Sequence, residues 1–126
     1  MEQSDLIGVI ALLIHAAKID ENYTEKEEKI IKDFLIKFET NENRQKEVLQ
    51  KAEKLELNSN QLLNFTNIIK KNEKIDKYMI IEQLWKIIIS DNNSDQYESN
   101  LMRRICGLIY FPDKLSGEIK LKLKKK

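Results

Sequence analysis

Apolar residues along this chain recur three and four positions apart, which is the spacing of one face of an α-helix. Near the N-terminus, Leu6, Ile10, Leu13, Ile14 and Ala17 form such a face. Three glycines and one proline leave few interruptions, so successive helices joined by short polar turns are expected. The predicted helices are residues 4–19, a segment after residue 24 that ends at the polar stretch 39–43, residues 44–55, a segment after residue 60 through residue 69, a segment after residue 74 to about 90, and residues 95–110.

The C-terminal part of the pattern is less regular. Phe111 and Pro112 end the last predicted helix, and a short further segment is expected after them. Ile119, Leu121 and Leu123 alternate with lysines as in a β-strand, but no second strand is predicted to pair with them. We therefore predict an all-α compact bundle of about six to seven helices, with a single domain at 1–118 and a frayed, Lys-rich tail at 119–126.

One polar motif, D-x-N-x-[T/D]-x-x-E, occurs twice, and the apolar residues that flank the two copies match in register. Leu13 corresponds to Leu84 and Phe34 to Ile105. The repeat predicts a bundle built from two pseudo-repeated helix–acidic turn–helix units. The first copy contains Asp20, Asn22, Thr24 and Glu27, and the second contains Asp91, Asn93, Asp95 and Glu98.

Helix capping explains half of these residues. Thr24 and Glu27 have the spacing of a capping box, in which the hydroxyl accepts from the third helical amide and the carboxylate accepts from the cap amide. Asp95 and Glu98 repeat the arrangement with aspartate as the cap. Such a cap stabilises a helix by about 1 kcal/mol without any ligand.

Capping does not explain Asp20 and Asp91. Each follows a predicted helix, where a carboxylate opposes the helix dipole at a cost of roughly 0.3–1 kcal/mol. Either the free amides of the next helix offset this cost, or a cation does. Oxygen ligands favour calcium, magnesium or manganese over zinc. The candidate metal ligands are Asp20, Asn22, Glu27, Asp91, Asn93, Asp95 and Glu98.

The oxygen-bearing side chains at the first, third and fifth positions resemble the start of a calcium-binding EF-hand loop. The sixth position, which is glycine in an EF-hand, is Glu25 or Gln96. The twelfth, which is glutamate in an EF-hand, is Ile31 or Met102. The motif is therefore not an EF-hand.

Charge and composition exclude several classes of function. The 22 basic and 21 acidic residues nearly cancel, so the chain has no overall field that would attract nucleic acid or an anionic membrane. The apolar segment 6–17 is too short to span a bilayer, and Glu2 and Asp5 precede it where a signal peptide would have basic residues. The single cysteine, Cys106, fits a reducing compartment and the spacing of a buried position. These features favour a cytoplasmic protein.

No residue pattern indicates catalysis, because the chain lacks a nucleophile–base pair, a phosphate-binding glycine loop and a Cys/His cluster. His15 is expected to be partly buried and hydrogen-bonded, and Trp85 is expected in the core. Arg103 and Arg104 are expected on the exposed side of their helix, with an ion pair to Glu27, Glu98 or Asp91 favoured over a role in anion binding.

The residues of both turns resemble the tellurite-resistance TerB-like family, in particular its small stand-alone bacterial members. The resemblance rests on A-K-I-D at 17–20 with Glu27, and more specifically on Trp85 and D-Q-Y-E-x-x-L-x-R-R at 95–104. It covers nearly the whole chain. It implies an all-helical fold of about seven helices in two related halves and no enzyme activity. It also implies a divalent-metal site at Asp20, Glu27, Asp91 and Glu98.

The family is associated with tellurite resistance, with stress responses that involve membrane-linked complexes, and with the membrane-proximal domain of a co-chaperone. Glu21 and Asn92 stand where the family pattern has glycine, and glutamate tolerates a left-handed turn less well than asparagine. The leading hypothesis is a non-enzymatic stress-related module with a cation site, acting with other proteins of a stress-response or membrane-associated complex. The alternative is a protein-interaction scaffold whose acidic turns only cap helices. A hydrolytic enzyme that uses these acids is a more distant third.

Overall fold

The computed structural model describes residues 1–18, 24–59, 62–90 and 96–124, without the side chains of 96–98. This part of the chain contains seven α-helices and no strand, as the apolar spacing predicts. The helices are α1 (Gln3–Ala17), α2 (Glu25–Phe38), α3 (Glu42–Leu57), α4 (Leu63–Ile69), α5 (Lys74–Ser90), α6 (Gln96–Leu108) and α7 (Asp113–Lys124).

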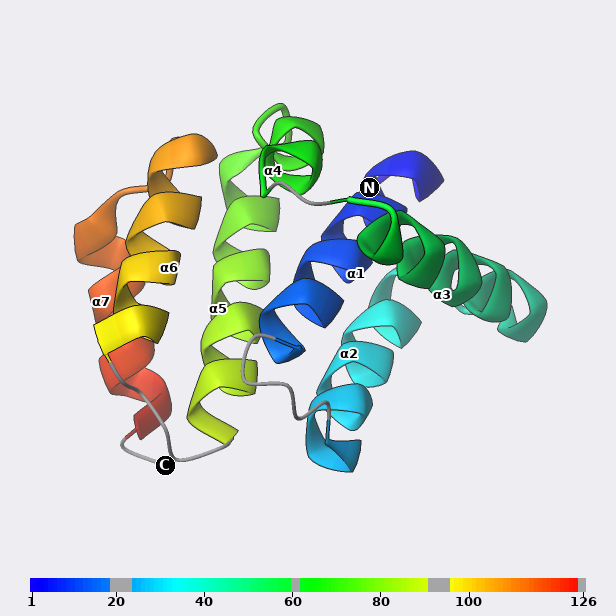
Figure 1. Ribbon diagram of the computed structural model, residues 1–126, viewed down its shortest axis with the longest axis horizontal. Helices are drawn as coiled ribbons and strands as arrows, with labels where there is room; N and C mark the ends of the chain where they lie inside the picture. The colour runs from blue at the N-terminus through cyan, green and yellow to red at the C-terminus, as the bar shows by residue number, and fades with distance from the viewer. Residues whose placement is uncertain (19–23, 60–61, 91–95, 125–126) are drawn as a thin grey trace.

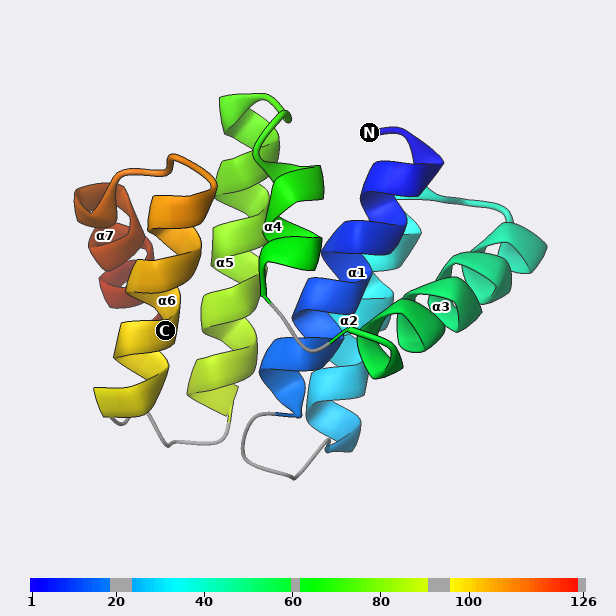
Figure 2. The ribbon, with the colours of Figure 1, turned by 45° about the horizontal axis from the view of Figure 1, so that its top comes forward.

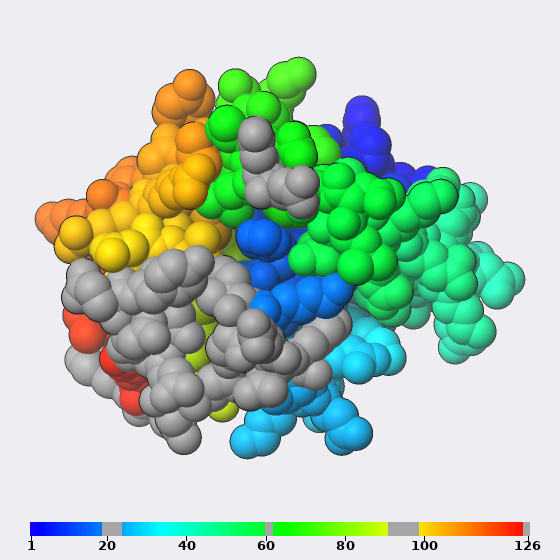
Figure 3. All heavy atoms as spheres, in the orientation of Figure 1, coloured from blue at the N-terminus to red at the C-terminus, as the bar shows by residue number. Residues whose placement is uncertain are grey.

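Helix α1 lies at the centre of the bundle (Figures 1 and 2) and contacts α2, α3, α4 and α5. Ten of its 15 residues are buried, because its sequence is apolar on nearly every side. In the space-filling view, blue atoms appear in two small areas, one at the upper rim and one near the middle of the face beside green atoms (Figure 3). Helix α5 packs against α1, α2 and α7, and α6 contacts α4 and α7.

Helix α3 begins two residues earlier than its apolar pattern predicts, at Glu42. The side chain of Asn41 caps it by accepting a hydrogen bond from the amide of Arg44 at 3.1 Å. The polar stretch 39–43 therefore contains a helix start as well as a helix end.

The C-terminal segment corrects the predicted tail. Helix α7 crosses the boundary drawn at residue 118, and Ile119 is only 1% exposed. Leu115, Ile119 and Leu123 are spaced four residues apart and pack against the core, whereas Leu121 is 61% exposed. The strand-like alternation is thus one helical face formed by Leu115, Ile119 and Leu123, and Leu121 lies on the opposite, exposed side of the helix.

No helix in the described ranges is long and apolar enough to cross a membrane.

Gly8 of α1 lies close to Ile68 of α4. A Cβ atom built on Gly8 would lie 2.9 Å from two side-chain carbons of Ile68 and 3.1 Å from its Cβ. A methyl group therefore does not fit unless the Ile68 side chain or the two helices move.

We expect Gly8→Ala to lower the free energy of unfolding by about 1–3 kcal/mol, the usual cost of inserting a methyl into a packed core. Gly107→Ala is the matched control, since a Cβ there meets nothing within 4 Å. Urea denaturation of both variants measures the effect. Equal stabilities would contradict the close approach of α1 and α4.

Candidate functional site

The two acidic motifs are flanked by helix ends that lie on one side of the molecule. The C-terminal ends of α1 and α5 and the N-terminal ends of α2 and α6 all lie at the lower end of the bundle (Figures 1 and 2). Helix α5 contacts both α1 and α2, so the two helix pairs are adjacent. The packing therefore places the four helix ends that flank the two motifs at one end of the fold.

Of the predicted metal ligands, only Glu27 is a fully described residue. Glu98 lies in α6, and its side chain is outside the described part of the structure. Five other predicted ligands lie outside the described residues, and these are Asp20, Asn22, Asp91, Asn93 and Asp95.

Glu27 forms the predicted capping box at the start of α2. The Thr24 amide donates to Glu27 Oε1 at 2.8 Å, and the Thr24 hydroxyl donates to the same oxygen at 3.0 Å. In return, the Glu27 amide donates to Thr24 Oγ1 at 3.2 Å. Glu27 is only 1% exposed, so these hydrogen bonds replace water around a buried carboxylate.

This arrangement is compatible with Glu27 as a helix cap alone and with Glu27 as a metal ligand. The capping bonds and the N-terminal dipole of α2 stabilise its negative charge without a metal. A buried carboxylate is also a ligand type that calcium, magnesium and manganese prefer. Within the described residues, no group of three or more His, Cys, Asp or Glu side chains could hold a metal. A cation at this end would therefore need oxygens from the two acidic motifs in addition to Glu27.

The two residues predicted to be buried, Trp85 and Cys106, lie in the core. Trp85 is 4% exposed, and its indole Nε1 donates to Ser116 Oγ at 2.9 Å. Cys106 is fully buried, and this burial raises the pKa of its thiol above the ordinary value.

Arg103 and Arg104 are exposed on α6, as predicted. Among their three predicted partners, the side chains of Glu98 and Asp91 lie outside the description, and the described bonds of Glu27 go to Thr24.

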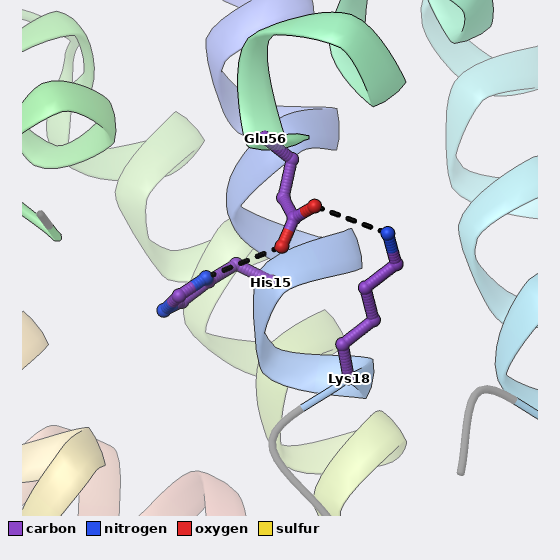
Figure 4. A network of polar contacts seen from close by, with 3 residues as sticks. All are labelled: His15, Lys18 and Glu56. Carbon is purple, nitrogen blue, oxygen red and sulfur yellow. Dashed lines mark hydrogen bonds and ion pairs between the residues drawn. The ribbon is translucent and has the colours of Figure 1, made fainter. Parts of the chain in front are cut away.

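His15 takes part in a polar network that the sequence does not reveal (Figure 4). Its Nδ1 lies 3.5 Å from Oε1 of Glu56 on α3, and Lys18 Nζ donates to the other oxygen of Glu56 at 3.1 Å. The imidazole is half-buried and packs against the ring of Phe65. The Glu56 side chain is 10% exposed, so it joins α3 to α1 from a largely buried position.

Glu56 is not among the residues that the sequence singles out. One signal was present, because Glu56 continues the four-residue spacing of Val48 and Ala52, the buried residues of α3. A carboxylate on a buried helix face needs a partner, but the sequence does not show that His15 and Lys18 supply it.

The seven helices of the described residues define an all-helical bundle, in which the ends of α1, α2, α5 and α6 lie at one end. The family model described as "Tellurite resistance protein TerB" matches residues 6–121, and the chain belongs to this family. No curated protein and no solved structure matches the chain.

Removal of the cap at α2 should measurably lower the free energy of unfolding. Thr24→Ala deletes the hydroxyl that bonds both the amide and the carboxylate of Glu27, so we expect a loss of about 1 kcal/mol in unfolding free energy. Thr40→Ala is the control, since Thr40 is exposed between α2 and α3. Chemical denaturation of both variants checks this, and equal losses would argue against the capping role.

Glu56→Gln keeps the shape of the side chain but removes its charge from between His15 and Lys18. Because both partners are about one-third exposed, we expect a cost near 1 kcal/mol rather than the larger cost of a fully buried pair. Glu47→Gln, which breaks the exposed Glu47–Lys51 pair on the same helix, should cost less. Thermal unfolding at neutral pH compares them, and a larger effect at Glu47 would refute the linking role of Glu56.

Proposed function

We propose that this TerB-family chain is a non-enzymatic module of tellurite resistance and stress response that binds one divalent cation, calcium, magnesium or manganese. The observation that carries the proposal is the common location of the helix ends that flank both acidic motifs. Two carboxylates held 4 Å apart would repel each other by about 4 kcal/mol at an effective dielectric near 20. A bound cation would remove that repulsion.

In this proposal, Glu27 contributes one carboxylate from the start of α2, where its burial limits competition from water. The remaining oxygens come from the other candidate ligands in the two motifs. The cation would link the α1–α2 pair to the α5–α6 pair and so stiffen this end of the bundle.

The described core supports a non-enzymatic role. The pKa of the Cys106 thiol is raised by burial, so this thiol stays protonated and unreactive at neutral pH. His15 lies beside Glu56 in a contact between helices. The family description names tellurite resistance, and we propose other proteins of a stress-response or membrane-associated complex as partners.

A second candidate function is a protein-interaction scaffold, and one observation favours it. Tyr110 has φ of 60° and is 76% exposed. It occupies the left-handed position of a helix C-terminal motif, in which Phe111 N donates to Cys106 O at 2.8 Å. Glycine is the usual residue there, so an exposed tyrosine at this strained position suggests a role in contacting a partner.

Titration of the metal-free protein with calcium, magnesium and manganese, followed by amide NMR, tests the cation site. We expect saturable shifts, or line broadening with manganese, confined to residues 20–28 and 91–99. We also expect the melting temperature to rise with cation concentration, because a ligand that binds only the folded state stabilises it. Absence of any response at millimolar cation would overturn the cation site and leave the scaffold function.

Two variants separate metal binding from capping. Glu27→Gln preserves a capping box, which accepts glutamine at this position, but it removes a charged ligand and should reduce the cation-dependent rise in melting temperature. Asp91→Asn should abolish it. Glu25→Gln, an exposed acid of the same helical turn, should leave the rise unchanged. An equal loss in the Glu25 variant would mean that only the general charge of this end matters.

A further inference from the structure

Two strongly exposed apolar side chains lie at one corner of the bundle. Ile75 in the first turn of α5 is 66% exposed, and Tyr110 directly after α6 is 76% exposed. Single exposed apolar residues are common on protein surfaces, whereas a group of them marks a site of interaction. This corner lies at the upper end of the bundle, opposite the helix ends that flank the acidic motifs (Figures 1 and 2).

An aromatic contact joins the two segments of the corner. The rings of Tyr78 and Phe111 meet edge to face, with their centroids 6.4 Å apart. Ile75 precedes Tyr78 by three residues, so both lie on the same side of α5. Tyr110 directly precedes Phe111, which is 4% exposed and anchors the link between α6 and α7. The contact therefore brings the segments that carry Ile75 and Tyr110 next to each other.

The backbone of Tyr110 is strained. Its φ of 60° is in the left-handed region, which glycine adopts at the end of a helix without strain. Because the ring is mostly in solvent, its burial does not offset this strain within the described chain. Tyrosine is among the residues that contribute most to binding at protein interfaces. A contact outside the chain would therefore explain a tyrosine at this position.

Lysines surround the exposed apolar residues. Five of them lie in the segments 70–78 and 110–114, and these are Lys70, Lys71, Lys74, Lys77 and Lys114. All five are exposed or partly exposed. The ion pairs between described residues involve none of them. Their charges are thus available to a partner of opposite sign.

Three acids in the same segments reduce the positive charge of the corner. Glu73, Asp76 and Asp113 against five lysines leave a net charge of +2. Asp76 and Asp113 lie in the first turns of α5 and α7, where the positive helix ends offset part of their charge. A mixed surface with a positive excess is suited to an acidic protein segment. It is less suited to nucleic acid, whose closely spaced phosphates would meet these acids as well as the lysines.

We propose that this corner binds an acidic segment of a partner protein. Apolar side chains of that segment contact Ile75, Tyr78 and Tyr110, and its carboxylates lie beside the surrounding lysines. The proposal rests on the second candidate function, the protein-interaction scaffold, and names the chemistry of its partner. The corner and the proposed cation site lie at opposite ends of the bundle, so separate measurements test them.

A random peptide library displayed on phage is the probe for this surface. We expect the selected peptides to combine acidic residues with aliphatic or aromatic ones and to bind with micromolar dissociation constants. Binding should weaken as salt is added, because salt screens the attraction to the lysines. Amide NMR shifts should be confined to residues 73–79 and 108–115. Failure to select any peptide, peptides without acidic residues, or shifts elsewhere would overturn the proposal.

Tyr110→Gly separates binding from folding. Glycine relieves the backbone strain, so the melting temperature should rise, while binding of the selected peptide should weaken about tenfold. A loss of binding in a more stable protein cannot result from unfolding. Leu57→Ser is the control, since Leu57 is 71% exposed at the end of α3, and it should leave binding unchanged. Full binding by the Tyr110 variant would refute the role of the ring.

Charge variants test the part played by the lysines. Lys74→Gln and Lys114→Gln should each weaken peptide binding several-fold and reduce its dependence on salt. Lys46→Gln removes an exposed charge on α3 and should change neither quantity. If all three variants behave alike, only the overall charge of the protein matters and the proposed position of the carboxylates is wrong.

A second copy of the chain and an anionic membrane are the alternative occupants of the corner. Analytical ultracentrifugation of the protein alone tests the first. Co-sedimentation with vesicles of phosphatidylcholine and phosphatidylglycerol tests the second. We expect a monomer that does not bind these vesicles. Self-association or vesicle binding that Tyr110→Gly abolishes would assign the corner to that occupant and overturn the acidic segment.

Discussion

The burial of α1 is the interaction on which the rest of the fold depends. Most helices of the bundle expose a polar side, but α1 is buried on nearly all sides and contacts four other helices. Each fully buried leucine or isoleucine side chain contributes about 1.5–3 kcal/mol relative to exposure. Helices α2, α3, α4 and α5 therefore arrange themselves around α1, and Gly8 shows how closely, because no methyl group fits between it and Ile68.

The position of the candidate cation site follows from this packing. Helices α1 and α5 lie side by side and end at the same side of the bundle (Figures 1 and 2). The helices that follow each of them, α2 and α6, begin there, so both acidic motifs are flanked at that end. The capping box of Thr24 and Glu27 sets the start of α2 and buries the Glu27 carboxylate there. A residue that serves local helix geometry is thereby placed where a cation would need a ligand.

Local features were predictable from the sequence and long-range contacts were not. The helices follow from apolar spacing, and the capping box follows from Thr24 and Glu27 alone, because its atoms are three residues apart. Ile119 was assigned to the tail because its alternation with Leu121 masked a helical face. The Glu56 network joins residues far apart in sequence, so no local pattern indicates it. The twofold repeat of the helix pairs stays a prediction.

The three glycines of the bundle differ in how far the packing requires them. Gly8 is explained within the chain, since any side chain there would collide with Ile68. Gly117 has no such explanation, since a Cβ would meet open space in the middle of a helix. Gly107 in α6 is similar, because a Cβ there also meets nothing within 4 Å. Of the three glycines, only Gly8 is therefore required by the packing, because its missing side chain lets Ile68 of α4 lie against the central helix.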